Sequence, residues 1–321
     1  MTMTKIKGLY LEDFLAQYGL TLVSAKEEVL KKLKEEKAIT VHSGPEFHQD
    51  ETLGTATLLL IAKNILNIDQ EEIAIIRTRN EEEFKGVVLD VGGTYLDHHM
   101  EPEKRAHRQD GIKYAAAGLV WAIMGNLLVP ERFVENVDRK LFKPSDMADN
   151  GEGTATMSFA EIMCPIDDDD DLMKCYMETV YHYIRVLERL IKYYQKVSEK
   201  GDLTPYLKKG NETGIMILPK YIPWEEEAVH SNVKFVIWQN DDETSEDKYL
   251  AKVVPVEEGS FVAKVPFPEC YKGIPLLGKR TAYFNECGNE EIKNLTFVHS
   301  EKFFACSKNL DSLLAVIKSV L

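Results

Sequence analysis

The chain has 321 residues, enough for two domains of ordinary size, and its apolar fraction of 44% and charged fraction of 29% are typical of a folded globular protein. Its formal net charge of −14 excludes a broad basic surface for duplex nucleic acid, so an anionic substrate must meet local positive charge or metal. The five cysteines form no CxxC pair, no apolar run approaches the ~20 residues that span a bilayer, and residues 1–5 lack a signal-peptide core. We therefore expect a cytoplasmic protein with reduced cysteines.

The first half alternates between helical and strand-like patterns. Short apolar runs that end at turn residues predict strands over 38–41, 73–76 and 86–91. Apolar residues at helical spacing predict helices over 12–37, 50–65, 114–124, 133–146 and 170–200. This order indicates an α/β domain with a largely parallel sheet flanked by helices, because its strands are apolar enough for burial on both faces.

The pattern changes after Gly201, where strand-like runs are divided by polar turns. We expect strands over 233–238, 249–254, 261–265 and 295–298, and a terminal amphipathic helix over 310–321. These predict a smaller α+β domain with an antiparallel sheet. The predicted division is a metal-binding catalytic domain over 1–204 and a substrate-binding domain over 205–321. The acidic run 167–171 is expected to cap the long helix, since it lacks the spacing and glycine of an EF-hand.

Histidines and acidic residues gather where the first predicted strand ends. His42 follows that strand, and the turn 43–45 carries the chain to His48 and Asp50 at the start of a helix. In an open α/β sheet this edge is where ligands bind. Two imidazoles and a carboxylate suit Mn²⁺, Fe²⁺ or Zn²⁺ better than Mg²⁺, which prefers oxygen ligands alone. The alternative is that Asp50 only caps its helix and the histidines lie free on the surface.

A second group follows the strand over 86–91. Asp90 ends this strand, and the glycines at 92 and 93 let the backbone or a ligand approach closely. His98 and His99 follow within one short loop. Because consecutive side chains of an extended segment point in opposite directions, one can bind metal while the other faces substrate or a carboxylate. A lone aspartate at the strand end would simply cap a turn.

A third group lies near the end of the helix over 133–146. Asp146 and Asp149 are three residues apart and share a helix face, and Gly151 supplies a stop signal. Carboxylates at a helix C-terminus oppose its dipole by roughly 0.3–1 kcal/mol each, a cost that a nearby cation offsets. Solvated acids at a helix end are the alternative.

Together these motifs resemble those of the DHH phosphoesterase superfamily, and most closely the melanocyte-proliferating-gene family, whose members are also described as metal-dependent protein hydrolases. The matching segments are HSGPEFHQDE at 42–51, LDVGG at 89–93, DHH at 97–99, RQDGIKYAAAGLVW at 108–121 and DMADNG at 146–151. FVHSEKFF at 297–304 resembles a motif of the family's C-terminal domain. The resemblance covers most of residues 38–321 and is more specific in the first half.

The resemblance implies a two-lobed enzyme whose N-terminal lobe holds two divalent metal ions, usually Mn²⁺. Mapped by motif, the ligands of one ion are His42, His48 and Asp90. The ligands of the other are Asp50, Asp90, His98 and one of Asp146 or Asp149, with Asp90 as the bridge. Two ions a few ångströms apart stabilise both the attacking and the leaving oxygen of an in-line displacement.

The resemblance also implies substrate contacts. His99 is expected to contact the phosphate, and Arg108 to neutralise charge that develops on it. His299 either faces the interdomain cleft and binds substrate or is a partly exposed residue at a strand end. The basic residues Lys279, Arg280, Lys302 and Lys308 either line the same cleft or are ordinary solvated side chains.

The chain departs from the family pattern at three points. One extra residue separates His42 from His48, and the loop between Gly93 and Asp97 is short. The segment 305–306 is Ala-Cys where the family has a glycine pair, at which backbone amides meet the substrate.

These residues predict a metal-dependent hydrolase that cleaves phosphoester or phosphodiester bonds by a two-metal mechanism, such as a nuclease or oligonucleotide phosphodiesterase. The expected substrates are small phosphate compounds or short single-stranded nucleic acids, with no membrane partner. A pyrophosphatase-like enzyme is one alternative, and a catalytically weak metal- or nucleotide-binding protein is another. A purely structural protein would leave the histidine and aspartate clusters unexplained. The pattern does not decide the oligomeric state.

Overall fold

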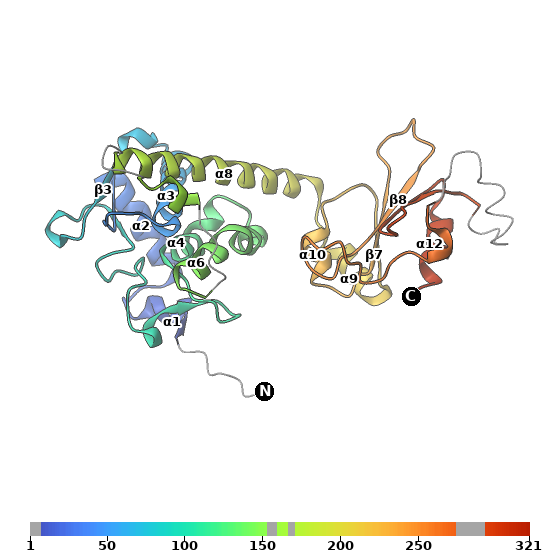
Figure 1. Cartoon of the computed structure of the whole chain (residues 1–321), viewed down its shortest axis with the longest axis horizontal. Helices are drawn as coiled ribbons and strands as arrows, with labels where there is room; N and C mark the ends of the chain where they lie inside the picture. The colour runs from blue at the N-terminus through green and yellow to red at the C-terminus, as the bar shows by residue number, and fades with distance from the viewer. Residues whose placement is uncertain (1–7, 153–158, 166–170, 274–292) are drawn as a thin grey trace. The chain divides into compact units, whose positions relative to one another are not determined.

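The chain forms two compact units, one that ends at Gln195 and one from Lys196 to Leu321 (Figure 1). The computed structural model describes residues 8–152, 159–165, 171–273 and 293–321, so most of the acidic run 167–171 and both Lys279 and Arg280 lie outside the described residues. The predicted fold class is confirmed, because the first unit has parallel sheets with helices and the second has a mainly antiparallel sheet. The division of labour predicted for 1–204 and 205–321 stays a prediction.

The region predicted as one helix over 12–37 is two helices, α1 (Leu11–Ala16) and α2 (Leu22–Glu36). Gly19 has a φ of +70°, a conformation that turns the chain between them. Thr21 then starts α2 with a capping box, in which its side chain accepts from the Ser24 amide at 3.2 Å and the Ser24 hydroxyl accepts from the Thr21 amide at 2.8 Å. Before α1, β1 (Leu9–Tyr10) pairs in parallel with β5 (Ala106–His107).

A three-stranded parallel sheet is the centre of the first unit. Its middle strand β2 (Ala38–Val41) is buried along its length and lies between β3 (Ala74–Arg77) and β4 (Val87–Leu89). Val41 pairs with Arg77 on one side and Leu89 on the other, so the three strands end at one edge. His42 and Asp90 directly follow two of these strands, and they therefore emerge at the same edge.

Helix α3 (Gln49–Leu66) connects β2 to β3 and is buried over Asp50–Ala62. It packs against α4 (Ala116–Met124), and one glycine in each helix permits the close approach of a neighbouring element. A Cβ at Gly54 would meet Leu89 Cδ2 at 2.8 Å, and one at Gly118 would meet Asp146 Oδ2 at 1.8 Å. Gly54 thus lets α3 lie close to β4, and Gly118 lets the buried Asp146 carboxylate lie close to the backbone of α4.

The rest of the first unit is helical. The region predicted as a helix over 133–146 contains α5 (Val134–Val137), a π-helical turn (Asp138–Phe142) and α6 (Lys143–Asp149). They are followed by α7 (Phe159–Met163) and the long α8 (Leu172–Lys200). No helix among the described residues is long and apolar enough to cross a membrane.

The second unit has a five-stranded sheet in the order β6-β7-β8-β10-β9. The pair β6–β7 is parallel and the other pairs are antiparallel. Its elements are α9 (Thr204–Thr213), β6 (Ile215–Leu218), α10 (Glu225–Val229), β7 (Phe235–Gln239), β8 (Tyr249–Val253), β9 (Leu295–Val298), β10 (Phe304–Ser307) and α12 (Leu310–Lys318).

Alternate residues of β7 enter two different cores. Phe235 and Ile237 pack with apolar residues of α12, whereas Val236 and Trp238 pack with residues around α10. The period of two explains this division, since successive side chains of a strand point to opposite faces. The central sheet of the second unit is therefore covered on both faces.

The prediction of a strand over 261–265 is wrong. Only Ala263 forms a β-bridge there, with Pro255, and Phe261 is 97% exposed. Strand β8 already pairs with β7 and β10, so no free edge of β8 is left for this segment to extend along. The strands β6 and β10 were not predicted, because Ile215–Leu218 is too short a run to tell from a helix and Phe304–Ser307 has no β-branched residue.

Candidate metal centre

Asp90 lies in the loop that follows β4 and has a φ of +61°, in the left-handed region where aspartate is tolerated better than most residues. Its amide donates to the carbonyl of Leu96 at 3.0 Å, which folds the loop back on itself. Gly92 and Gly93 also have positive φ, and a Cβ at Gly92 would meet Phe84 Cε2 at 2.5 Å. This tight loop brings the DHH segment back beside Asp90.

Asp97 organises that segment. Its Oδ2 accepts from the Gly93 amide at 2.7 Å, while its Oδ1 accepts from the His99 amide at 3.0 Å and faces His99 Nδ1 at 2.8 Å. Burial raises the pKa of Asp97, but these hydrogen bonds outweigh it and lower the pKa to about 2. The hydrogen bond between Asp97 Oδ1 and His99 Nδ1 also raises the pKa of His99. Asp97 thus orients the ring of His99 and leaves Nε2 as the nitrogen available to a ligand.

His98 lies between two carboxylates. Its Nε2 is 3.1 Å from Asp90 Oδ1 and 3.2 Å from Asp149 Oδ2, and the imidazole is buried. A single N–H can point at only one of these oxygens, whereas a cation would attract all three groups. Asp90 Oδ1 and His98 Nδ1 are buried and form no hydrogen bond with any described residue. Atoms of Asp90, His98 and His99 lie within 4.8 Å of one another, and so do atoms of Asp50, His98 and Asp149.

Asp50 connects this cluster to α4. Its two carboxylate oxygens accept from the amides of Ala116 at 2.9 Å and Ala117 at 2.6 Å, so it caps α4 instead of its own helix. Burial, followed by the charges of Asp90 and Asp149, raises the pKa of Asp50. A carboxylate offers about four lone-pair sites, so these two hydrogen bonds leave capacity for a cation.

Asp146 is held by a different partner. Arg108 Nη2 donates to Asp146 Oδ2 at 2.7 Å, and its Nε and Nη2 each donate to Asp138 at 2.6 Å. Burial raises the pKa of Asp146 to about 8 although Arg108 lowers it. Of the two aspartates left open by the sequence, Asp149 therefore lies beside His98 and Asp146 pairs with Arg108. A contact between Arg108 and substrate stays a prediction.

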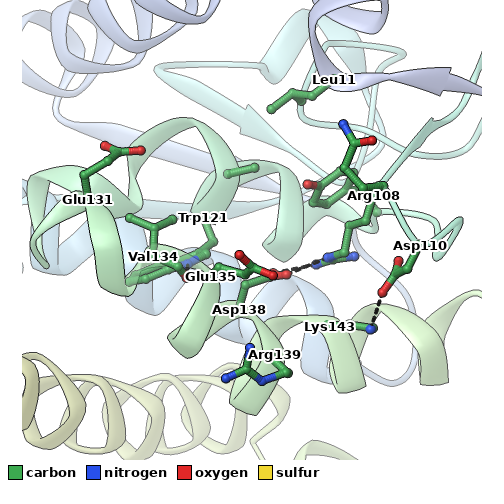
Figure 2. A pocket seen from close by; sticks show the side chains of 13 residues that line it. Leu11, Arg108, Asp110, Trp121, Glu131, Val134, Glu135, Asp138, Arg139 and Lys143 are labelled. Carbon is green, nitrogen blue, oxygen red and sulfur yellow. Dashed lines mark hydrogen bonds and ion pairs between the residues drawn. The ribbon is translucent and has the colours of Figure 1, made fainter. Parts of the chain in front are cut away.

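Arg108 also lines a cavity of about 480 Å³ (Figure 2). The cavity lies between the segment that carries Arg108 and the helices that carry Glu131, Val134 and Lys143. Two ion pairs line it, Arg108 with Asp138 and Lys143 with Asp110. Neither His98 nor the carboxylates beside it line this cavity, so it is separate from the candidate metal centre.

The two histidines of the first motif lie at the margin of the cluster. The ring of His42 stacks on that of His99 with centroids 5.9 Å apart, and its Nε2 accepts from Arg79. Burial lowers the pKa of His42. The side chain of His48 is 52% exposed, and its Nδ1 is 3.7 Å from Glu51 Oε2. Neither histidine belongs to the two groups whose ligand atoms lie within 4.8 Å, so their roles as ligands stay predictions.

His299 belongs to the second unit. Its Nδ1 accepts from the Glu301 amide at 3.0 Å, and its ring lies 4.2 Å from that of Phe303. Lys302 pairs with Glu269, and Lys308 pairs with Glu246 at 2.9 Å. The substrate contacts expected for these residues stay predictions.

Sequence reasoning did not single out Glu51, Arg77 or Arg79 as site residues. Glu51 is completely buried, and burial raises its pKa to about 8. An acidic residue in the first turn of a helix is what the helix dipole favours, so nothing in the sequence marked Glu51 as buried. The two arginines could have been found from the sequence, because Arg77 ends β3 and Arg79 follows it. They therefore lie at the same sheet edge as His42 and Asp90.

The donor set fits a divalent cation. Three carboxylates and two imidazoles converge in the cluster formed by Asp50, Asp90, His98, His99 and Asp149. Burial and mutual repulsion raise the pKa values of Asp50 and Asp149, which a cation would reverse. Mixed nitrogen and oxygen ligands suit Mn²⁺, Fe²⁺ or Zn²⁺. The cluster could therefore hold metal, which agrees with the kind of site predicted from the sequence.

The chain matches a known protein family over most of its length. Residues 38–321 match the family model MYG1_exonuc, described as an uncharacterised protein family (UPF0160). The matched range contains every residue of the cluster and the whole of the second unit. No curated protein and no solved structure matches the chain.

Proposed function

The chain belongs to the MYG1_exonuc family, and from this premise we propose that it is a divalent-metal-dependent hydrolase of phosphoester bonds, with a centre of the DHH phosphoesterase type. The family label suggests a nuclease-like hydrolase. The observation that carries the proposal is the approach of Asp90 and Asp149 to one nitrogen of His98, at 3.1 and 3.2 Å. Two carboxylates that approach one imidazole nitrogen repel each other, and a cation would offset this repulsion.

We propose two metal positions that share Asp90. One is completed by Asp50, His98 and Asp149, whose ligand atoms lie within 4.8 Å of one another. The other uses Asp90 with the histidines His42 and His48. Mn²⁺ is the proposed metal because both positions mix imidazole and carboxylate ligands.

Bound divalent ions would supply neutralisation of phosphoryl charge and activation of the attacking water. The protein supplies orientation. Asp97 holds Nδ1 of His99 at 2.8 Å, which presents Nε2 to a phosphate oxygen. Arg108 donates to Asp138 and Asp146, and its positive charge offsets part of the negative charge of these carboxylates. His299 is proposed to contact the substrate from the second unit.

The proposed substrates are nucleotides or short single-stranded oligonucleotides. A net charge of −14 disfavours binding of long duplexes, whose affinity depends on many phosphate contacts by lysine and arginine. Short substrates need few such contacts, and the metal centre itself would neutralise the reacting phosphate.

The experiment uses the full chain stripped of metal with a chelator and then supplied with Mn²⁺. Turnover is measured on bis-p-nitrophenyl phosphate, inorganic pyrophosphate and an end-labelled short RNA. Metal-dependent release of nitrophenol and of nucleotides from the RNA supports the proposal. Release of orthophosphate from pyrophosphate alone would replace it with a pyrophosphatase, and Mn²⁺ binding without turnover would replace it with a binding protein. Absence of both binding and turnover would overturn the metal centre itself.

A further inference from the structure

Glu51 is a completely buried carboxylate that lies beside the candidate metal centre. Neither of its oxygens has a partner at hydrogen-bond geometry, although the amides of His48 and of Glu51 itself are close enough to lower its pKa. A buried carboxylate without a hydrogen bond costs free energy, so a residue in this state calls for an explanation.

Arg77 holds Glu51 from one side. The Arg77 Nη2 lies 3.8 Å from Glu51 Oε1 and donates to the Glu46 carbonyl at 3.0 Å. Its guanidinium lies over the rings of Tyr176 and Phe47, at 5.0 and 5.9 Å from their centroids. The Tyr176 hydroxyl in turn donates to the Glu51 carbonyl at 3.2 Å. Arg77 from β3 thus faces the carboxylate of Glu51, and Tyr176 from α8 binds its backbone.

His48 faces Glu51 from the other side. His48 is the N-cap residue of α3 and Glu51 is the third helical residue, so the two lie on one face of the first turn. The other Glu51 oxygen, Oε2, lies 3.7 Å from His48 Nδ1, close enough to attract the imidazole but too far for a hydrogen bond. The imidazole is 52% exposed and has room to rotate, whereas the carboxylate is fixed.

We propose that Glu51, anchored by Arg77, is the positioning residue for His48: it accepts the N–H at Nδ1 and so presents Nε2 as a lone-pair donor to a divalent cation. Histidine ligands commonly donate their other ring N–H to a carboxylate in this way. This inference rests on the proposed function, in which His48 is a metal ligand. It also explains why Glu51 is buried without a hydrogen bond, because its partner is the ring that turns toward it.

Two other roles make different predictions. As a capping residue, Glu51 would stabilise the first turn of α3 whether or not His48 carries an imidazole. As a direct metal ligand, Glu51 would contribute to metal affinity independently of His48. A double-mutant cycle separates these roles from positioning, since only a residue that acts through His48 loses its effect when His48 is replaced.

The test measures Mn²⁺ affinity by calorimetry on the metal-stripped full chain and its variants. We expect Glu51→Ala and His48→Ala each to weaken one Mn²⁺ site by about 10–100-fold, and the double variant to be no weaker than His48→Ala alone. Glu51→Gln keeps an acceptor oxygen and should recover most of the affinity. The exposed Glu46→Gln, in the same loop, removes a charge and is the matched control, with unchanged affinity. Additive losses in the double variant would overturn the proposal.

A second measurement needs no metal. In the metal-free protein, nitrogen NMR of the imidazoles should show the His48 proton on Nδ1 in the wild type and in Glu51→Gln. In Glu51→Ala it should move toward Nε2. The same tautomer in wild type and Glu51→Ala would overturn the positioning role even when Mn²⁺ binds normally. A wild type that binds no Mn²⁺ but shows the Nδ1 tautomer would instead overturn the proposed function and leave the Glu51–His48 pair standing.

Discussion

The two units differ in the burial of their acidic side chains. In the first unit five described carboxylates are buried, namely Asp50, Glu51, Asp90, Asp97 and Asp146. In the second unit every described acidic residue is at least partly exposed, and the buried polar residues there are Thr296, Ser307 and Ser312. Both units have apolar cores around a sheet, so fold alone does not account for the difference.

This contrast locates the chemistry. Burying a carboxylate costs free energy unless hydrogen bonds or an opposite charge offset it. Asp97 and Asp146 have such partners, in His99 and Arg108, whereas Asp90 Oδ1 and Glu51 have no hydrogen bond among the described residues. A protein retains unsatisfied buried carboxylates where a ligand completes them, and the first unit is where the family motifs concentrate.

The largest expected effect is on catalysis. Asp90→Asn keeps a residue that tolerates the φ of +61° but removes the charge proposed to bridge two ions. We expect Mn²⁺-dependent turnover to fall by about 1000-fold, the equivalent of several kcal/mol of transition-state stabilisation. The control is Asp241→Asn, an exposed aspartate of the second unit, which should leave turnover unchanged. An Asp90→Asn enzyme with wild-type kcat/KM would remove the bridge from the mechanism.

A substitution in the apolar core of the second unit should affect stability and leave metal binding unchanged. Phe235 is completely buried in the core beneath α12, and Phe235→Ala should destabilise this unit by about 3–5 kcal/mol. Hydrogen exchange of β7 should accelerate while Mn²⁺ affinity stays unchanged. Phe261→Ala, at a residue that is 97% exposed, is the control and should change stability by less than about 0.5 kcal/mol. Loss of Mn²⁺ binding in Phe235→Ala would break the separation between the two units.

A smaller effect is expected where α4 meets Asp146. A Cβ at Gly118 would lie 1.8 Å from Asp146 Oδ2, so Gly118→Ala must displace a carboxylate that Arg108 holds. We expect a loss of about 1–3 kcal/mol in the free energy of unfolding, measured by urea titration. Gly44→Ala adds the same methyl group where its nearest contact is 3.5 Å and should be nearly neutral. Equal stability of the two variants would contradict the close packing of α4 on Asp146.

A dependence of stability on pH is expected from the first unit alone. In the folded chain the pKa values of Glu51 and Asp146 are raised to about 8, from ordinary values of 4.5 and 3.8. The folded state therefore binds more protons than the unfolded state between about pH 4.5 and 8, and stability falls as pH rises through this window. Without metal we therefore expect Tm to fall steadily as pH rises from 5 to 8. Glu51→Gln should flatten this slope, and a Tm that rises over the same range would contradict the burial of these carboxylates.

Much of the fold could be predicted from local patterns. Apolar runs of characteristic period predicted the strands β2 and β4 and the helices α3 and α8. The residues that each of these elements buries are close together in the sequence, so the pattern is local. The failures are the strand over 261–265, the single helix over 12–37 and the missed strands β6 and β10. A strand forms only where a neighbouring strand has a free edge, and a helix ends where turn and capping residues stop it. The hydrophobic period alone shows neither condition.

The sequence by itself determined which residue types the candidate site would contain and the sheet edge at which His42 and Asp90 emerge. It did so because parallel strands end together and because acidic and imidazole side chains stand directly after them. Only the tertiary structure decided that Asp149 lies beside His98 while Asp146 pairs with Arg108, and that Asp50 caps α4. Only the tertiary structure brought Arg77 beside Glu51. These choices depend on contacts between segments far apart in the chain, and such contacts leave no local pattern.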